Sequence, residues 1–108
     1  MAQAIGYVTK LEDGTYKGNL RMGVNTKIEI VENGSKDPKT AQPDYRVISS
    51  ELGEVGGAWD KVGEVSGNPY ISVTLAHPMI GRRKVYANLG QAHGGDAQDY
   101  ALLWNPEG

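Results

Sequence analysis

Apolar and polar residues alternate most clearly over residues 69–78 of this chain. Ile71, Val73 and Leu75 point one way and the residues between them point the other way, which is the period of a strand with one buried face. A proline at each end fits a strand that starts and stops there. The pattern therefore predicts the central strand of a small antiparallel sheet domain.

The same alternation predicts strands before and after this one. The strongest local signal is a hairpin, in which residues 5–10 and 16–21 flank Asp13-Gly14 and the glycine supplies the positive φ of the turn. Further strands are predicted over residues 26–32, 45–49, 54–61, 84–89 and 99–104. Inward positions on them are Ile28, Ile30, Tyr45 and Val47, and Tyr100, Leu102 and Trp104 share one face of the last strand.

These short strands predict an all-β, mainly antiparallel fold. No window of useful length repeats apolar residues at helical spacing, so any helix would be a short one near Leu52 or the termini. About seven or eight strands in one small domain favour a β-barrel or a sandwich, because either arrangement hides strand edges. The 15 glycines, spread without a fixed period, suit many tight turns and bulges.

Length and composition indicate one ordinary globular domain. The 108 residues are 39% hydrophobic and 22% charged, so we expect a single β domain over 1–108. Within it, residues 33–44 are expected to form an exposed loop and residues 105–108 a tail. No apolar run approaches the length of a membrane span and no export signal is evident, so the expected setting is cytoplasmic, without a membrane partner.

Charge and cysteine content exclude several kinds of site. The 11 Lys and Arg residues against 13 Asp and Glu give a net charge of -2, without the basic excess that holds a polyanion by counterion release alone. Cysteine is absent, which excludes disulfides, thiolate metal sites and thiol nucleophiles. Any contact with nucleic acid would have to come from a local patch.

Several short motifs follow one another in a specific order and spacing. They include Ile5-Gly6-Tyr7, Tyr16-Lys17-Gly18, Pro43-Asp44-Tyr45-Arg46-Val47, Gly57-Ala58-Trp59, Tyr86-Ala87-Asn88-Leu89 and Tyr100-Ala101-Leu102-Leu103-Trp104. Through them the chain resembles, nearly end to end, the bacterial proteins grouped as domain of unknown function 736. It departs from that family's pattern at Met22-Gly23, where the family tends to carry Thr-Leu, and in the Arg82-Arg83 loop.

The resemblance implies a small cytoplasmic protein, often encoded on plasmids and integrative elements. It brings no catalytic residues to carry over. Small proteins in that genetic setting tend to act on DNA transfer, on regulation or against host defences, which is an association rather than a physical argument.

The residues that could bind a partner fall into a basic group and an aromatic group. The candidates are Arg46, Tyr70, Arg82, Arg83, Lys84 and Tyr86. Arg82-Arg83-Lys84 is the only compact basic run, which could grip phosphate or an acidic protein surface, or simply keep a hairpin loop soluble. Tyr70 and Tyr86 fall out of phase with their apolar neighbours and are expected to face solvent. Most of the other tyrosines and tryptophans are interpreted as core residues.

No motif carries catalytic, cofactor or metal chemistry. His77 and His93, even with Asp96, show no ligand spacing. The glycines of residues 53–57 are not followed by a helix that could present its N-terminus to a phosphate. We therefore expect no enzyme activity and no cofactor.

Two functions from different classes remain. The leading hypothesis is a non-enzymatic interaction protein of a mobile genetic element, which contacts a partner protein through a sheet face and the loops at 33–44 and 82–84. Inhibition of a host defence complex is one specific version. The alternative is a barrel that binds single-stranded nucleic acid by stacking bases on exposed Tyr70 and Tyr86 beside Arg82, Arg83 and Lys84. The pattern of residues specifies neither the partner nor the oligomeric state.

Overall fold

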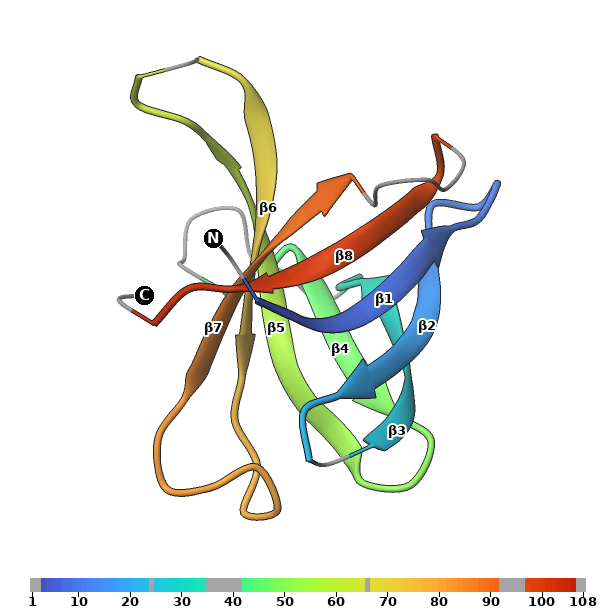
Figure 1. The fold of residues 1–108 in the computed structure, drawn as a ribbon. Coiled ribbons are helices and arrows are strands. Elements are labelled where there is room, and N and C mark those ends of the chain that lie inside the picture. Colours follow the sequence, from blue (N-terminus) through green and yellow to red (C-terminus); the bar gives the residue numbers. More distant parts are fainter. Residues whose placement is uncertain (1–2, 24, 35–41, 66, 92–96, 107–108) are drawn as a thin grey trace.

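The protein is a closed eight-stranded antiparallel barrel (Figure 1). The computed structural model describes residues 3–23, 25–34, 42–65, 67–91 and 97–106, and these contain no helix. The strands are β1 (Ala4–Lys10), β2 (Tyr16–Arg21), β3 (Asn25–Glu32), β4 (Tyr45–Ser49), β5 (Gly53–Val62), β6 (Pro69–Leu75), β7 (Val85–Gln91) and β8 (Asp99–Trp104). Each pairs with the next along the chain, and β8 pairs back onto β1. The all-β prediction is confirmed, and of its two alternatives the barrel is the one formed.

The hairpin of β1 and β2 has the predicted turn. Gly14 adopts φ 87°, a backbone conformation that favours glycine. The Asp13 carboxylate accepts the Thr15 N–H at 2.9 Å, and this hydrogen bond is the main cause that lowers the pKa of Asp13. The turn residues and the strand alternation therefore both indicate the hairpin that β1 and β2 form.

Inward-facing aliphatic side chains fill the barrel. Its fully buried large side chains are Leu20, Ile28, Ile30, Val47, Val55, Val73, Leu75 and Leu102. The predicted alternation of Ile28 and Ile30 on β3 and of Val73 and Leu75 on β6 is confirmed, and Tyr45 packs half-buried against this core. The interior of the described barrel is therefore a packed core of side chains.

Two details of the predicted central strand are wrong. β6 ends at Leu75 instead of continuing to Pro78, because a turn over residues 78–80 follows, in which the His77 carbonyl accepts the Ile80 N–H at 2.9 Å. Nor is β6 central, since every strand of a closed barrel has two neighbours.

A buried pair of hydroxyl groups fixes the junction of β4 and β5. The Thr26 and Ser49 hydroxyl oxygens lie 2.7 Å apart, and Ser49 Oγ also accepts the N–H groups of Glu51 and Leu52 at 3.1 and 3.0 Å. These bonds satisfy polar groups that burial would otherwise leave unpaired, and they hold the tight turn after β4.

Because the strands run up and down in sequence order, their connections alternate between two ends. The strand ends that flank residues 11–15, 33–44, 63–68 and 92–98 belong to one end, called the upper end here from the place of the turn at 11–15 in Figure 1. The connections at 22–24, 50–52 and 76–84, together with the start of β1 and the end of β8, belong to the lower end.

Two predicted irregular segments fall partly outside the described residues. Residues 35–41 of the loop predicted at 33–44 are outside them, and at its base the Asn33 N–H donates to the Asp44 carbonyl at 3.0 Å. Of the tail predicted at 105–108, residues 107–108 are outside them, while the Asn105 N–H donates to the Tyr86 carbonyl at 2.8 Å. Asn105 is therefore held against β7.

Candidate functional site

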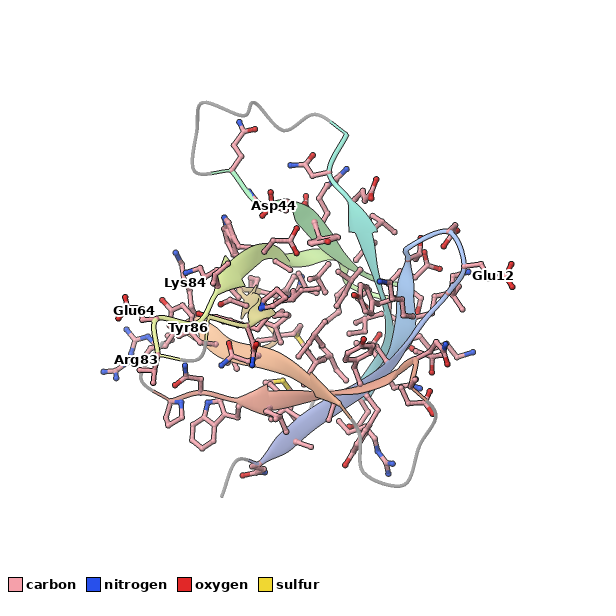
Figure 2. The ribbon with its side chains drawn as sticks, turned by 90° about the horizontal axis from the view of Figure 1, so that it is seen from above. Glu12, Asp44, Glu64, Arg83, Lys84 and Tyr86 are labelled. Carbon is pink, nitrogen blue, oxygen red and sulfur yellow. The ribbon has the colours of Figure 1, made fainter. Side chains whose placement is uncertain are left out.

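Four of the candidate partner-binding residues lie together at the lower end. Arg82, Arg83, Lys84 and Tyr86 line one hollow of about 790 Å³ between the β6–β7 connection and the segment that follows β8. Its other lining residues are Ile80, Gly81, Val85, Trp104, Asn105 and Pro106. We call this set of residues the basic hollow. Figure 2 shows Arg83, Lys84 and Tyr86 on the same side of the barrel.

Backbone hydrogen bonds shape the connection that carries the basic run. The His77 carbonyl accepts the N–H groups of Ile80 and Gly81 at 2.9 and 3.2 Å, and His77 Nδ1 accepts the Met79 N–H at 3.1 Å. His77 therefore has a structural role in this turn. The bond from Asn105 to Tyr86 brings the C-terminal segment beside the same connection.

The three cations of the basic hollow are exposed and available. Within the part of the chain that the structure describes, no ion pair joins Arg82, Arg83 or Lys84 to a carboxylate. Like charges on adjacent residues also reinforce one another's field. The site can therefore attract an anionic group without first breaking an internal ion pair.

Arg46 lies elsewhere and is already paired. On the outer face of β4 and β5, its guanidinium donates to both carboxylate oxygens of Glu54, at 2.9 and 3.2 Å. This hydrogen bonding raises the pKa of Arg46 and lowers the pKa of Glu54. Of the candidate basic residues, Arg46 is thus the one that the structure does not bring to the basic hollow.

The exposed aromatic side chains differ in part from those expected. Tyr70 is 37% exposed, but it lies at the upper end, away from the basic hollow, whereas Tyr86 is half-buried beside the cations. Trp104 has the parity of buried Leu102 and was expected in the core, yet it is 43% exposed. Trp104 is the last residue of β8 and lies at the rim of the barrel, so no further residue of the strand follows to cover its ring. Tyr7 is 51% exposed and alternates with buried Val8. This alternation could have identified Tyr7 as an exposed aromatic residue from the sequence.

A second hollow, of about 300 Å³, lies in the mouth of the barrel at the upper end. The rings of Tyr16 and Tyr45 meet edge to face with centroids 6.5 Å apart, and those of Tyr16 and Tyr100 do so at 5.6 Å. The Tyr45 hydroxyl lies 3.2 Å from both carboxylate oxygens of Asp60, to which it donates. We call the residues of this hollow the tyrosine mouth: Lys10, Tyr16, Tyr45, Asp60, Pro69, Tyr70, Ile71, Leu89 and Tyr100.

The tyrosine mouth shifts the ionisation of its own phenols. Burial raises the pKa of Tyr45 to about 12, and the neighbouring Asp60 charge adds to this effect. Burial likewise raises the pKa of Tyr16, with smaller contributions from Tyr100 and Asp60. Both phenols therefore remain neutral hydrogen-bond donors across the physiological pH range.

These shifts predict a loss of stability at high pH. The ordinary pKa of tyrosine is 10.0 and that of folded Tyr45 is about 12, so its contribution is complete below pH 10 and falls as the pH rises to about 12. Denaturant unfolding at several pH values should show this fall, and Tyr45→Phe should remove part of it, with Tyr16 retaining the remainder. An identical fall in Tyr45→Phe and the unchanged protein would contradict the assignment.

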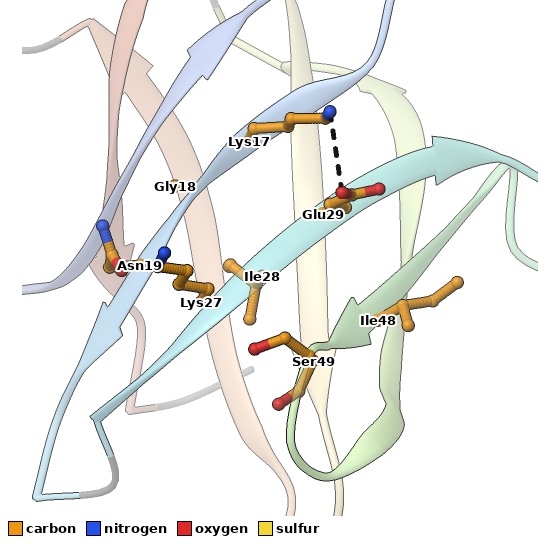
Figure 3. A pocket seen from close by; sticks show the side chains of 9 residues that line it. Lys17, Gly18, Asn19, Lys27, Ile28, Glu29, Ile48 and Ser49 are labelled. Carbon is orange, nitrogen blue, oxygen red and sulfur yellow. Dashed lines mark ion pairs between the residues drawn. The ribbon is translucent and has the colours of Figure 1, made fainter.

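A third hollow, of about 470 Å³, lies over β2, β3 and β4 (Figure 3). Its lining includes Ile48, Lys27 and an ion pair in which Lys17 Nζ lies 3.7 Å from Glu29 Oε1. The ion pair is solvent-exposed, so it contributes little to stability. None of the candidates predicted from the sequence lies here.

No metal site is visible in the described part of the chain. Among those residues, no group of three or more His, Cys, Asp or Glu side chains is placed to hold a metal ion. His93 and Asp96, considered above together with His77, lie outside the described residues. The described residues also contain no helix of the length and apolarity needed to cross a bilayer.

Comparison with protein-family models gives a match over nearly the whole chain. A family model described as "Protein of unknown function (DUF736)" matches residues 4–107. No curated protein and no solved structure matches the chain.

Proposed function

This chain belongs to the DUF736 family, and we propose that it is a non-enzymatic binding protein whose basic hollow contacts an acidic surface of a partner protein. The proposal includes the cytoplasmic and mobile-element setting that the resemblance implies, with a host or element-encoded complex as the partner. The observation that carries it is the meeting of Arg82, Arg83 and Lys84 with Tyr86 and Trp104 in one exposed hollow.

The residue types in the basic hollow support a protein contact. Arginine binds carboxylates through two parallel hydrogen bonds, and Trp, Tyr and Arg are the residues that most often dominate the energy of protein interfaces. The half-buried ring of Tyr86 and the partly exposed ring of Trp104 offer apolar area beside the charges. A partner would thus gain both electrostatic attraction and burial at one place.

The distribution of charge along the barrel also favours an acidic partner at the lower end. The upper end carries Glu12, Asp13, Asp44, Asp60 and Glu64 against Lys10 and Lys61 among the described residues. Figure 2 views the barrel from above, so Glu64 and Arg83 overlap there although their connections belong to opposite ends. The protein therefore has a local basic patch at the lower end although its net charge is -2.

The barrel topology narrows the original hypothesis. That hypothesis invoked the loops at 33–44 and 82–84 together, but the strand ends that flank these loops belong to opposite ends of the barrel. Residues 35–41 of the first loop lie outside the described residues, so the proposal is confined to the lower end.

A second candidate function, binding of single-stranded nucleic acid, is favoured by Trp104. Tyr70 lies at the upper end and cannot join the basic run, yet Trp104 takes its place beside Tyr86 and the three cations. Stacking of a base on such a ring contributes about 1–3 kcal/mol.

Capture from a bacterial host lysate tests the proposal. The tagged protein is compared with Arg82→Glu/Arg83→Glu and with a control, Lys27→Glu/Lys61→Glu, which reverses two exposed charges outside the hollow. We expect the unchanged protein and the control to retain the same partner protein after nuclease treatment, and the hollow variant to retain at least about tenfold less, a difference of about 1.4 kcal/mol.

Two outcomes would contradict it. Equal capture by all three proteins would remove the basic hollow from the interaction, and recovery of no specific partner would count against a protein contact altogether. Binding of a labelled single-stranded oligonucleotide that weakens steeply with salt and is lost in Trp104→Ala would establish the second candidate instead.

A further inference from the structure

We propose that the tyrosine mouth at the upper end is a binding site for an organic cation, a guanidinium or alkylammonium group. This site lies at the opposite end of the barrel from the basic hollow and does not depend on the function proposed there.

Two charged residues at the rim of this mouth are exposed but have the parity of inward-facing strand positions. Lys10 follows buried Val8 by two residues on β1, and Asp60 follows buried Ala58 by two residues on β5. Both line the hollow. Their positions bring an ammonium and a carboxylate to the same opening.

The hollow has the chemistry of a cation site. Asp60 supplies a carboxylate, and the rings of Tyr16, Tyr45 and Tyr100 supply aromatic faces that attract positive charge. The Tyr45 hydroxyl bonds both oxygens of Asp60 and so fixes the carboxylate, while Asp44 Oδ2 accepts the Asp60 backbone N–H at 2.8 Å. The Asp44 carboxylate therefore contacts the backbone of the residue that carries the first carboxylate.

Lys10 shows that a cation is favoured here. Its Nζ lies 5.9 Å from the centroid of the Tyr16 ring, a cation–π distance. Within the described residues no ion pair joins Lys10 to Asp60, so the carboxylate is not neutralised by it. Lys10 is the last residue of β1, and its flexible stem lets the ammonium leave the ring when a ligand cation arrives. Lys10 therefore competes with a ligand cation for the Tyr16 ring.

The volume of the hollow limits the ligand to a compact group. At about 300 Å³ it is at the small end of ligand sites, which suits a guanidinium or a methylated ammonium with a short apolar stem. Such a group occurs both in free small cations and at the ends of Arg and Lys side chains.

Titration of the full chain, followed by NMR of the tyrosine ring protons, tests the site. Agmatine and choline represent free cations, and short Gly/Ala peptides with one central Arg or trimethyl-lysine represent side chains. We expect saturable shifts at Tyr16, Tyr45 and Tyr100 with at least one probe. The source that binds more tightly identifies whether the natural ligand is a small molecule or a protein side chain.

Three variants separate the site from general electrostatics. Asp60→Asn should weaken binding at least about tenfold, whereas Glu12→Gln, which removes one charge at the same end but points away from the mouth, should leave it unchanged (Figure 2). Lys10→Met should tighten binding severalfold because it removes the competing ammonium. Backbone spectra of each variant establish that the barrel has folded.

The proposal would be overturned by any of the following results. Absence of saturable shifts with every probe would remove the site, as would equal weakening by Asp60→Asn and Glu12→Gln. Weaker binding in Lys10→Met would mean that Lys10 contacts an anionic part of the ligand, so the ligand would not be a simple cation.

Discussion

Replacing Gly56 with alanine is expected to lower the free energy of unfolding by about 3 kcal/mol. A Cβ atom at this position would overlap the Thr74 carbonyl oxygen on β6 and would lie 3.1 Å from the Cα of Leu75. Both obstacles are backbone atoms, which cannot rotate away as a side chain would. The two strands would have to separate locally, breaking ladder hydrogen bonds where β5 pairs with β6.

Gly34→Ala provides the matched control. An added Cβ there meets nothing within 4 Å, so the same chemical change should alter stability by less than about 0.5 kcal/mol. Urea unfolding of the two variants and the unchanged protein measures the difference. If Gly56→Ala were as stable as Gly34→Ala, the close approach of β5 and β6 described here would be wrong.

Replacing Leu102 with alanine is expected to cost about 3–4 kcal/mol, since it removes buried methyl groups and leaves a cavity. Leu102 is fully buried on β8, opposite Gly6 of β1 and Leu89 of β7. Gly6 has no side chain of its own, and Leu102 Cδ1 occupies the space beside it, because a Cβ on Gly6 would come within 2.9 Å of that atom.

The adjacent leucine gives the contrast. Leu103 is half-buried on the outer face, where its side chain lies against Gly90, so Leu103→Ala should cost no more than about 1.5 kcal/mol. Thermal unfolding should show a Tm several degrees lower for Leu102→Ala than for Leu103→Ala. Equal shifts would mean that β8 does not present the face assigned to it.

Strand positions could be predicted because inward faces are mostly apolar and outward faces mostly polar. Ile28 and Ile30 on β3, and Val73 and Leu75 on β6, carry that signal without interruption. Even the glycine-rich strand, expected at residues 54–61, forms at Gly53–Val62. Alternation reports the local face of a strand, however, and not whether anything covers it, which is why Trp104 was placed in the core.

The candidate sites depend on which distant strands become neighbours. The basic run was evident, but its partner Trp104 is brought to it by the pairing of β7 with β8. The tyrosine mouth combines Tyr16, Tyr45 and Tyr100 from three strands that meet only when the barrel closes. Periodicity cannot show closure, so neither combination could be read from spacing alone.

Closure of the barrel by β1 and β8 is the claim on which both ends depend, and backbone NMR tests it most directly. The structure predicts cross-strand NOEs between Gly6 and Leu102 and between Val8 and Tyr100, with slowly exchanging amides along both strands. Absence of these NOEs, together with rapid exchange along β1 and β8, would show an open sheet and contradict the account.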